Sequence, residues 1–357
     1  VKKGYIMKII ETSSQFESFI EKYKGKEVLI HPILSDEHLH PLNNSISLIF
    51  VRIWSDLRYV DANHDDYVLC FNHSESLSLP DNCIQSLDLA DKIYTLNKKV
   101  LYQIYPYNNI LDVNMLKYLT DGSIVDISDF YTQSHSFYSR NYYKFKNHNI
   151  LIPIGHHYSF SQRIFARISR MIENCNINDI YDIYNGRVLN NLIYMESNGL
   201  CVDVDQIGLQ NKKHIDSSNR IYTEYNPYTT TGRPSNRFGG INFAALNKKD
   251  ESRKCFISRF NNDGFLIEYD YDAYHLRLIA DIIGYKLPSG SVHEYLGNQY
   301  GLDYQESKAM SFKLLYGGID KDIAKSIPFF GKVKKYIDIK WIEYKKSFSI
   351  QSEIYNR

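Results

Sequence analysis

The segment from Gly264 to Gly284 places a carboxylate between two different periodic patterns. Residues 265–270 alternate with a period of two, which predicts a β-strand that ends at Asp270. From Tyr274 the apolar residues recur every three or four positions, which predicts a helix that Gly284 ends. A carboxylate at a strand tip is held rigidly and open to a ligand, and Mg²⁺ binds a few protein oxygens together with substrate phosphates. The alternative for Asp270 is an ordinary solvated turn residue.

The segment ESKAMSFKLLYGG, residues 306–318, repeats a cation and two aromatic rings at intervals of four. Lys308, Phe312 and Tyr316 are therefore predicted to stack along one face of a helix. An ammonium binds phosphate, and flat rings stack on a base or pack against its sugar, so this face suits a nucleoside triphosphate. The alternative is that the rings belong to a hydrophobic core and the lysine extends past them.

These two segments resemble motifs A and B of family A DNA polymerases, the class of bacterial polymerase I. The upstream segment TTTGRPSNRFGGINFAALN, residues 229–247, is similar to the T-x-T-G-R segment of that family. Ser291-Val292-His293 resembles its D-x-H motif. The resemblance covers residues 229–318 and implies template-directed addition of deoxynucleotides to a primer 3′ end. The implied partners are primer-template DNA and deoxynucleoside triphosphates.

The resemblance also implies a role for each matching residue. Asp270 would be the catalytic ligand of Mg²⁺, and the carbonyl of Tyr271 would be a second metal ligand. The implied nucleotide-binding residues are Tyr271, His275, His293, Lys308, Phe312 and Tyr316, and the implied DNA-binding residues are Arg233, Asn242, Asn247 and Arg253.

The sequence departs from the family pattern at three places. His275 stands where the family has a glutamate that helps to exclude ribonucleotides, so sugar selectivity stays open. Tyr304 lies near the position of a triphosphate-binding arginine, which leaves Lys308 and Lys313 to supply more of the phosphate-binding charge. No H-D-E-type segment with a second catalytic aspartate follows Gly318. Two-metal phosphoryl transfer needs that carboxylate, so we expect a C-terminal polymerase chain to supply it as a partner.

The N-terminal part is expected to have the fold of a proofreading exonuclease domain. EVLIHPIL (27–34) and SISLIFVRI (45–53) are predicted strands that pair with each other. The family's first strand ends in an Asp-x-Glu pair that binds two metals, whereas here Asp36 and Glu37 come later and are adjacent. Adjacent residues of an extended chain point to opposite faces, so these two cannot share a metal. We therefore expect an exonuclease-like fold without activity.

We expect an α/β chain with two domains. Residues 1–178 would form a ribonuclease H-like exonuclease domain, and residues 179–357 the first half of a polymerase palm and the fingers. The link M-E-x-x-G-x-x-x-D, from Met195 to Asp203, resembles the family's exit from the exonuclease domain. Only residues 206–228 separate it from the T-T-T-G-R segment, so the thumb is reduced or absent. The alternative function is a non-catalytic DNA-binding or assembly protein that retains this fold.

The overall composition predicts a globular protein of the cytoplasm without a membrane partner, and the resemblance to DNA polymerases implies a nucleoid or a viral replication site. The net charge of +1 means that DNA contacts must come from local patches, such as the predicted helix with Arg163, Arg167 and Arg170. A solvated basic face is the alternative for that patch. Scattered histidines favour structural roles over a metal site. The five cysteines lack the paired spacing of a zinc site and are Cys70, Cys83, Cys175, Cys201 and Cys255.

Overall fold

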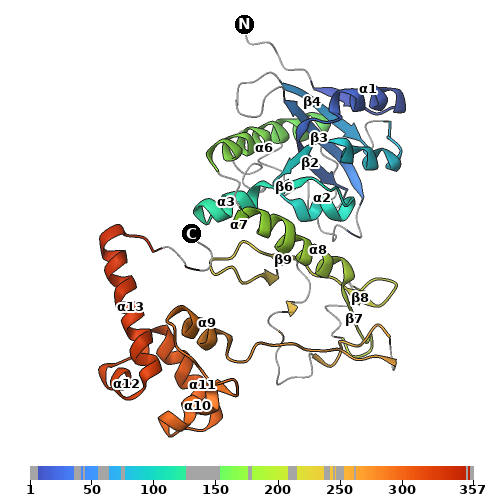
Figure 1. The fold of residues 1–357 in the computed structure, drawn as a ribbon. Helices are drawn as coiled ribbons and strands as arrows, with labels where there is room; N and C mark the ends of the chain where they lie inside the picture. Colours follow the sequence, from blue (N-terminus) through green and yellow to red (C-terminus); the bar gives the residue numbers. More distant parts are fainter. Residues whose placement is uncertain are drawn as a thin grey trace. The chain divides into compact units, whose positions relative to one another are not determined.

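Figure 1 shows a computed structural model of the chain, in which two units fold around separate cores. The units are Val1–Phe265 (unit 1) and Leu266–Arg357 (unit 2), and each is treated by itself. The predicted domain boundary between residues 178 and 179 stays a prediction. No described helix is long and apolar enough to cross a membrane. The structure describes residues 7–35, 42, 45–54, 64–73, 77–125, 153–175, 179–207, 215–236, 242–243, 246, 253–260, 263–350 and 353.

Unit 1 is built on a six-stranded mixed sheet of order β1-β4-β3-β2-β5-β6. β2 pairs antiparallel with β3, and β3 pairs antiparallel with β4. The pairs β1–β4, β2–β5 and β5–β6 are parallel. This confirms the expected α/β class and the predicted pairing of the first two long strands. The strands are β1 Lys8–Ile10, β2 Glu27–Leu34, β3 Ile46–Trp54, β4 His64–Cys70, β5 Lys92–Thr95 and β6 Ile110–Asp112.

Alternate residues of the central strands feed two separate cores, one on each face of this sheet. Val28 and Ile30 of β2 belong to the core that includes α1 (Ser13–Tyr23), whereas Leu29 belongs to the core that includes α6 (Ile154–Asn174). In Figure 1, α1 and α6 lie beside the strands of this sheet. A strand between two layers needs apolar or satisfied residues at every position, and all nine residues of β3 are buried.

A buried ion pair ties the predicted exit helix to the body of unit 1. Lys99 of α2 (Lys98–Ile104) binds the carboxylate of Glu196 in α8 (Leu189–Asn198), and both side chains are almost fully buried. Glu196 also accepts a hydrogen bond from the backbone N–H of Tyr225 at 2.7 Å. The glutamate of the M-E-x-x-G link therefore has a structural role.

Short elements complete unit 1. Gly199, with a positive φ of 58° that favours glycine, ends α8. The other elements are η2 Asp81–Leu89, α3 Val113–Asp121, α7 Asp179–Asp182, the π-helix η3 Ile183–Val188, β7 Leu200–Cys201, β8 Arg220–Ile221, β9 Tyr225–Asn226 and β10 Ser235–Asn236.

Unit 2 is helical in the part that the structure describes. Its core contains Leu276, Leu296, Phe329, Phe330 and Val333, all buried. The expected palm sheet is not among the described residues, so the palm and fingers stay a prediction. The helices are α9 Tyr274–Ile282, α10 Val292–Tyr300, α11 Tyr304–Lys313, the π-turn η8 Leu314–Gly318, α12 Lys321–Ser326 and α13 Pro328–Ser347.

The predicted strand at residues 265–270 is wrong. These residues are extended but join no described ladder, and the Tyr269 side chain is 91% exposed. Alternation of apolar residues is a local pattern, whereas a strand also needs a neighbour to pair with. The helix predicted after this segment is confirmed as α9. Near the C-terminus the described residues up to Ile350 form two helices and no strand.

Candidate functional site

Aromatic rings from three helices of unit 2 meet around Phe312 of α11. Its ring centroid lies 6.1 Å from that of His275 in α9 and 6.3 Å from that of His293 in α10. On its other side it lies 6.4 Å from the Tyr316 ring, with only 14° between the ring planes. The structure therefore brings together five of the six residues predicted to bind a nucleotide, namely these four rings and Lys308, whose ammonium acts on the pKa of His293. We call His275, His293, Lys308, Phe312 and Tyr316 the aromatic–cation cluster.

Close packing of α10 on α11 sets the position of His293 in this cluster. A methyl group added at Gly297 would lie 2.9 Å from the carbonyl oxygen of Leu302 and 3.3 Å from Cβ of Ser307, so only glycine permits this approach. The Ser307 hydroxyl, in turn, donates a 2.6 Å hydrogen bond to the His293 carbonyl. Ser291, two residues before the histidine, caps the start of α10 by accepting a hydrogen bond from the Glu294 N–H.

The imidazole of His293 is buried, with 3% of the residue exposed, and stands edge-on to the Tyr304 ring at 5.7 Å. Its Nδ1 has no hydrogen-bond partner among the described residues. Burial lowers the pKa of this imidazole, and the nearby Lys308 ammonium lowers it further, while Asp272 opposes both effects. This nitrogen is itself buried, so a ligand reaches it only when the neighbouring side chains move aside, and it can then accept or donate one hydrogen bond.

Arg277 fixes the turn before α9 to the loop that leads into α10. Its guanidinium binds the Asp272 carboxylate at 2.9 Å and the Asp272 carbonyl oxygen at 3.1 Å. It also donates to the carbonyl oxygens of Pro288 at 2.9 Å and Gly290 at 2.8 Å. One side chain thus holds both segments that carry predicted site residues. This role of Arg277 was not predicted from the sequence, because its carbonyl partners lie up to 13 residues away in a loop.

Tyr316 does not lie on the helix face on which it was predicted. α11 ends at Lys313, and Tyr316 lies in the π-turn η8 with non-helical angles, φ −87° and ψ 17°. Gly317 follows with φ 115°, a conformation that favours glycine. The tyrosine ring still stacks on Phe312 but is 78% exposed. The turn therefore presents a flat ring to solvent next to the cluster.

Asp270 and Tyr271 are both exposed in the extended segment before α9. The Tyr271 ring contacts that of Tyr274 at 5.6 Å, which in turn contacts His275 at 5.6 Å. Of the acidic residues two positions away from Asp270, Asp272 is already bound by Arg277. No group of three or more His, Cys, Asp or Glu side chains in the described ranges is arranged to hold a metal ion. These residues alone do not make a Mg²⁺ site, and we derive no step through a metal.

The predicted DNA-binding residues lie in unit 1. Arg233 is exposed after a turn in which its carbonyl oxygen accepts a 2.7 Å hydrogen bond from the Thr229 hydroxyl. Asn242 is exposed as well. Arg253 donates to the carbonyl oxygen of Leu246 at 3.2 Å. Asn247 lies outside the described residues, as do Asp36 and Glu37 of the predicted exonuclease region. Their roles stay predictions.

Unit 1 contains a buried polar network that the sequence analysis missed. Arg52 of β3 makes two hydrogen bonds to the Asp66 carboxylate of β4, at 2.7 and 2.9 Å, and both side chains are almost fully buried. Gln162 of α6 bonds to both of them, and Tyr158 donates to Asp66 at 3.3 Å. The residues are 14 to 110 positions apart in the sequence, so no local pattern could have revealed the network.

In the part of unit 1 that the structure describes, the buried histidines include His31 of β2, His157 of α6 and, in a loop, His73. His31 Nε2 and His157 Nδ1 have no hydrogen-bond partner among the described residues. Burial lowers the pKa of His31 to about 4. Burial and the neighbouring His31, His73 and His156 lower the pKa of His157 to about 3. The structural role predicted for the scattered histidines stays a prediction.

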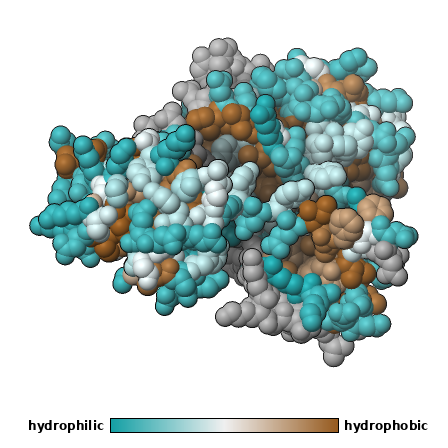
Figure 2. Space-filling view, turned by 60° about the horizontal axis from the view of Figure 1, so that its bottom comes forward, coloured by the Kyte–Doolittle hydropathy of each residue, from teal (hydrophilic) through white to brown (hydrophobic). Residues whose placement is uncertain are grey.

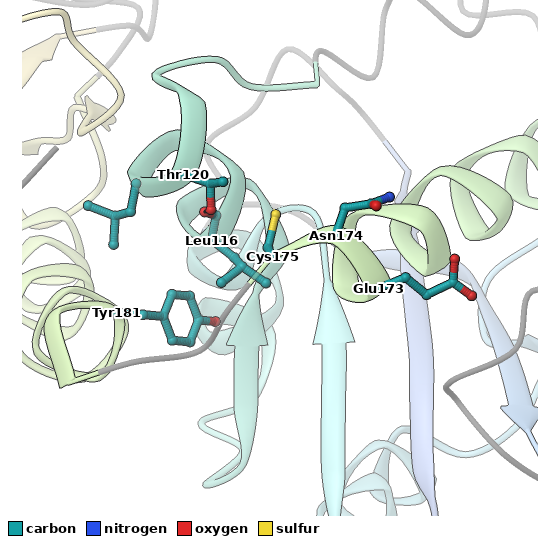
Figure 3. A pocket seen from close by; sticks show the side chains of 7 residues that line it. Leu116, Thr120, Glu173, Asn174, Cys175 and Tyr181 are labelled. Atoms are coloured by element: carbon teal, nitrogen blue, oxygen red, sulfur yellow. The ribbon is translucent and has the colours of Figure 1, made fainter. Parts of the chain in front are cut away.

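A pocket of about 350 Å³ lies between α3, α7 and the end of α6 in unit 1 (Figure 3). Thr120, Cys175 and Tyr181 reach it from three different elements. The Tyr181 hydroxyl already donates to the Asp112 carbonyl oxygen at 3.1 Å. The adjoining residues 176–178 lie outside the described part, and the pocket contains none of the predicted site residues.

The sequence matches no protein-family profile and no curated protein. Among solved structures, the chain is similar to the catalytic core of RRP6 from Trypanosoma brucei, with 10% identity and a TM-score of 0.32 over 54% of this chain. The match spans 52% of that protein. It is also similar to the EXO domain of Nibbler from Aedes aegypti, with 10% identity and a TM-score of 0.30 over 54% of this chain and 97% of that one. Function therefore has to be argued from the residues themselves.

Proposed function

We propose that unit 2 binds a deoxynucleoside triphosphate and supplies part of the site of a template-directed DNA polymerase. The observation that supports this is the aromatic–cation cluster, which gathers residues from α9, α10, α11 and η8 around Phe312. In this proposal Lys308 binds the phosphates as a point charge, and the unpaired nitrogen of His293 makes one further hydrogen bond to them. Phe312 and the exposed Tyr316 ring pack against the base and sugar.

Mutation of Lys308 tests this proposal. We expect Lys308→Ala to weaken binding of a fluorescent deoxynucleoside triphosphate by about 10- to 150-fold, because a charge-assisted phosphate contact contributes roughly 1.5–3 kcal/mol. Lys325→Ala, which removes an exposed lysine of α12, is the matched control and should leave the affinity within about twofold. Primer-template binding should stay nearly constant in both variants. Equal losses in the nucleotide and DNA titrations would show that Lys308 has no specific role with the triphosphate.

The proposal requires a partner chain, because the described residues offer Asp270 without the other carboxylates of a metal site. The partner would carry the second catalytic aspartate and bind through an obligate interface of roughly 2,000 Å² or more. Primer extension should be absent from the purified chain, appear when that partner is added, and disappear again with Asp270→Asn. An amide oxygen is a poor substitute for a carboxylate as a ligand of Mg²⁺. Robust primer extension by the purified chain alone would refute the requirement for a partner chain.

The second candidate is the non-catalytic DNA-binding or assembly protein. The lack of a carboxylate cluster among the described residues favours it, because a chain that binds nucleotides or DNA without catalysing a reaction needs no such cluster. The two candidates differ in one measurement. A partner that restores extension supports the polymerase, whereas DNA binding with no extension under any pairing supports the second candidate.

A further inference from the structure

The hairpin formed by β9 and β10 in unit 1 carries the predicted DNA-binding residue Arg233 in its connecting turn. Its two strands pair antiparallel over only two residues each. An isolated two-stranded hairpin is marginally stable in water, so contacts with the rest of unit 1 have to fix this one. The turn, residues 229–233, is closed by a 3.0 Å hydrogen bond from the Gly232 N–H to the Thr229 carbonyl oxygen.

Two tyrosines hold this turn against the body of unit 1. The Tyr118 hydroxyl, from α3, donates a 2.6 Å hydrogen bond to the Thr229 carbonyl oxygen. The Tyr228 hydroxyl lies 3.1 Å from both carboxylate oxygens of Asp112, the last residue of β6. The two rings pack edge to face, with their centroids 5.8 Å apart. We call Tyr118 and Tyr228 the tyrosine pair.

Asp112 is a fixed attachment point, because several elements of unit 1 bind it. Its carboxylate accepts hydrogen bonds from the backbone N–H groups of Met115 at 2.7 Å and Lys98 at 2.9 Å. The Asp112 N–H donates to the Asn185 side chain at 3.0 Å. The residue is fully buried, so water does not compete with Tyr228 for its carboxylate. Tyr228 is therefore bound to the rigid part of the unit.

Thr229 connects the tyrosine pair to Arg233. Its carbonyl oxygen is the acceptor for Tyr118, and its hydroxyl donates a 2.7 Å hydrogen bond to the Arg233 carbonyl oxygen. The strand β9 is held independently, since the backbone N–H of Tyr225 donates to the buried Glu196. The hairpin is thus fixed both at β9 and at its turn, so the backbone that carries the Arg233 side chain has a defined place on unit 1.

The Arg233 side chain is exposed and binds no carboxylate or carbonyl group among the described residues. Figure 2 shows hydrophilic surface over much of one face of the molecule, so exposure of a polar side chain does not by itself indicate a binding site. The distinguishing observation here is the fixed backbone beneath the exposed guanidinium. Thr231 is exposed in the same turn, and arginine and threonine side chains are among those that contact DNA phosphates. A guanidinium can bind a phosphate through two parallel hydrogen bonds, which requires a defined orientation.

We propose that Tyr118 and Tyr228 are positioning residues for DNA binding by unit 1, because they hold the turn 229–233 where the Arg233 guanidinium binds a backbone phosphate of the primer-template duplex. Neither tyrosine touches the DNA. A turn without these contacts would still carry the arginine, but ordering it on binding would cost part of the affinity. The inference rests on the proposed function for the identity of the ligand, and on the hydrogen bonds of the tyrosine pair for everything else.

Amide hydrogen exchange of the full chain without DNA tests the holding of the turn. Tyr228→Phe and Tyr118→Phe each remove only a hydroxyl group. We expect peptides covering residues 226–234 to exchange about 3- to 12-fold faster in both variants, the range of a single hydrogen bond. Tyr23→Phe is the matched control, since it removes a buried hydroxyl that donates to the Leu87 carbonyl oxygen at 2.7 Å in the core around α1, and it should leave these peptides unchanged. Unchanged exchange in either variant would overturn the inference for that tyrosine.

Binding of a fluorescent primer-template duplex is then titrated at several salt concentrations. Arg233→Ala should weaken binding and reduce the magnitude of the slope of log affinity against log salt by about 1, which corresponds to the loss of one phosphate contact. Tyr228→Phe should weaken binding by about 3- to 12-fold in the wild-type background and by less than about twofold in the Arg233→Ala background. Equal losses in both backgrounds would show that the tyrosine supports the fold without positioning the arginine, and would refute the inference.

Failure of the inference and failure of the proposed function give different results. A wild-type chain that binds the duplex, with additive effects of Tyr228→Phe and Arg233→Ala, refutes the inference and leaves the proposed function standing. A wild-type chain that does not bind the duplex refutes the proposed contact with DNA and removes the ligand from the inference. In that case hydrogen exchange still decides whether the tyrosine pair holds the turn.

Discussion

The buried histidines of unit 1 should make its stability fall steeply below neutral pH. His31 and His157 have folded-state pKa values of about 4 and about 3, below the ordinary value of 6.5. A group whose pKa is depressed by folding contributes stability above its unfolded pKa and loses it as the pH falls through that value. The relevant window therefore runs from about pH 6.5 down to about pH 4.

The size of the effect follows from these values. At pH 5 each histidine of the unfolded chain, with pKa 6.5, lies 1.5 units below its pKa, while the folded forms remain mostly neutral. At 1.36 kcal/mol per unit this destabilises the folded state by about 2 kcal/mol for each histidine, or about 4 kcal/mol for both, between pH 8 and pH 5. Typical domains have only about 5–15 kcal/mol of stability.

Other buried groups of unit 1 titrate in the same range, so the test compares variants. Burial raises the pKa of Asp112 to about 6, which makes the folded state gain stability as the pH falls from 6 towards 4. This opposes the histidines in the wild type. His157→Leu removes one histidine and leaves Asp112 in place. Between pH 8 and pH 5 its free energy of unfolding should therefore fall by about 2 kcal/mol less than that of the wild type. Met171→Leu, in the same core as α6, should shift stability equally at every pH.

The assay is urea unfolding at pH 8, 7, 6 and 5, followed by the fluorescence of Trp54 in a Trp341→Phe background. Trp54 is buried beside α6 and reports on unit 1. For each variant the free energy of unfolding is plotted against pH. The decisive quantity is the difference between the slopes of this plot for His157→Leu and for the Met171→Leu control. Identical pH dependence in the two variants would refute the assignment of acid sensitivity to the histidine.

Two further predictions concern the packing of each unit. Arg52→Met should destabilise unit 1 by about 3–5 kcal/mol, because it leaves the buried Asp66 carboxylate without its cation; a loss under about 1 kcal/mol in urea unfolding would contradict this. Gly297→Ala should cost unit 2 about 1–3 kcal/mol and weaken triphosphate binding, because the added methyl would lie 2.9 Å from the Leu302 oxygen. Gly290→Ala, where the added methyl meets nothing within 4 Å, is the control, and equal effects of the two changes on thermal unfolding would disprove the packing argument.

Several elements were predictable from the sequence because their signals are local. The apolar spacing from Tyr274 onwards predicts α9, and the structure places that helix at Tyr274–Ile282. The apolar run 27–34 predicts β2 with the same bounds. Gly199, with φ 58°, ends α8, and a glycine just after the last apolar position of a helix is a local signal of its end. Each signal lies within a few residues of the element that it specifies.

The tertiary structure alone decided which distant residues meet. Residues 265–270 alternate like a strand, yet pairing depends on a neighbour elsewhere in the chain, and no described segment provides one. Tyr316 left its predicted helix face because the π-turn and Gly317 change the direction of the backbone. The ring partners of His293, and the burial of His31 and His157, depend on how helices and strands pack. Sequence periodicity fixes which side of an element is apolar, whereas the packing of one element on another determines what that side touches.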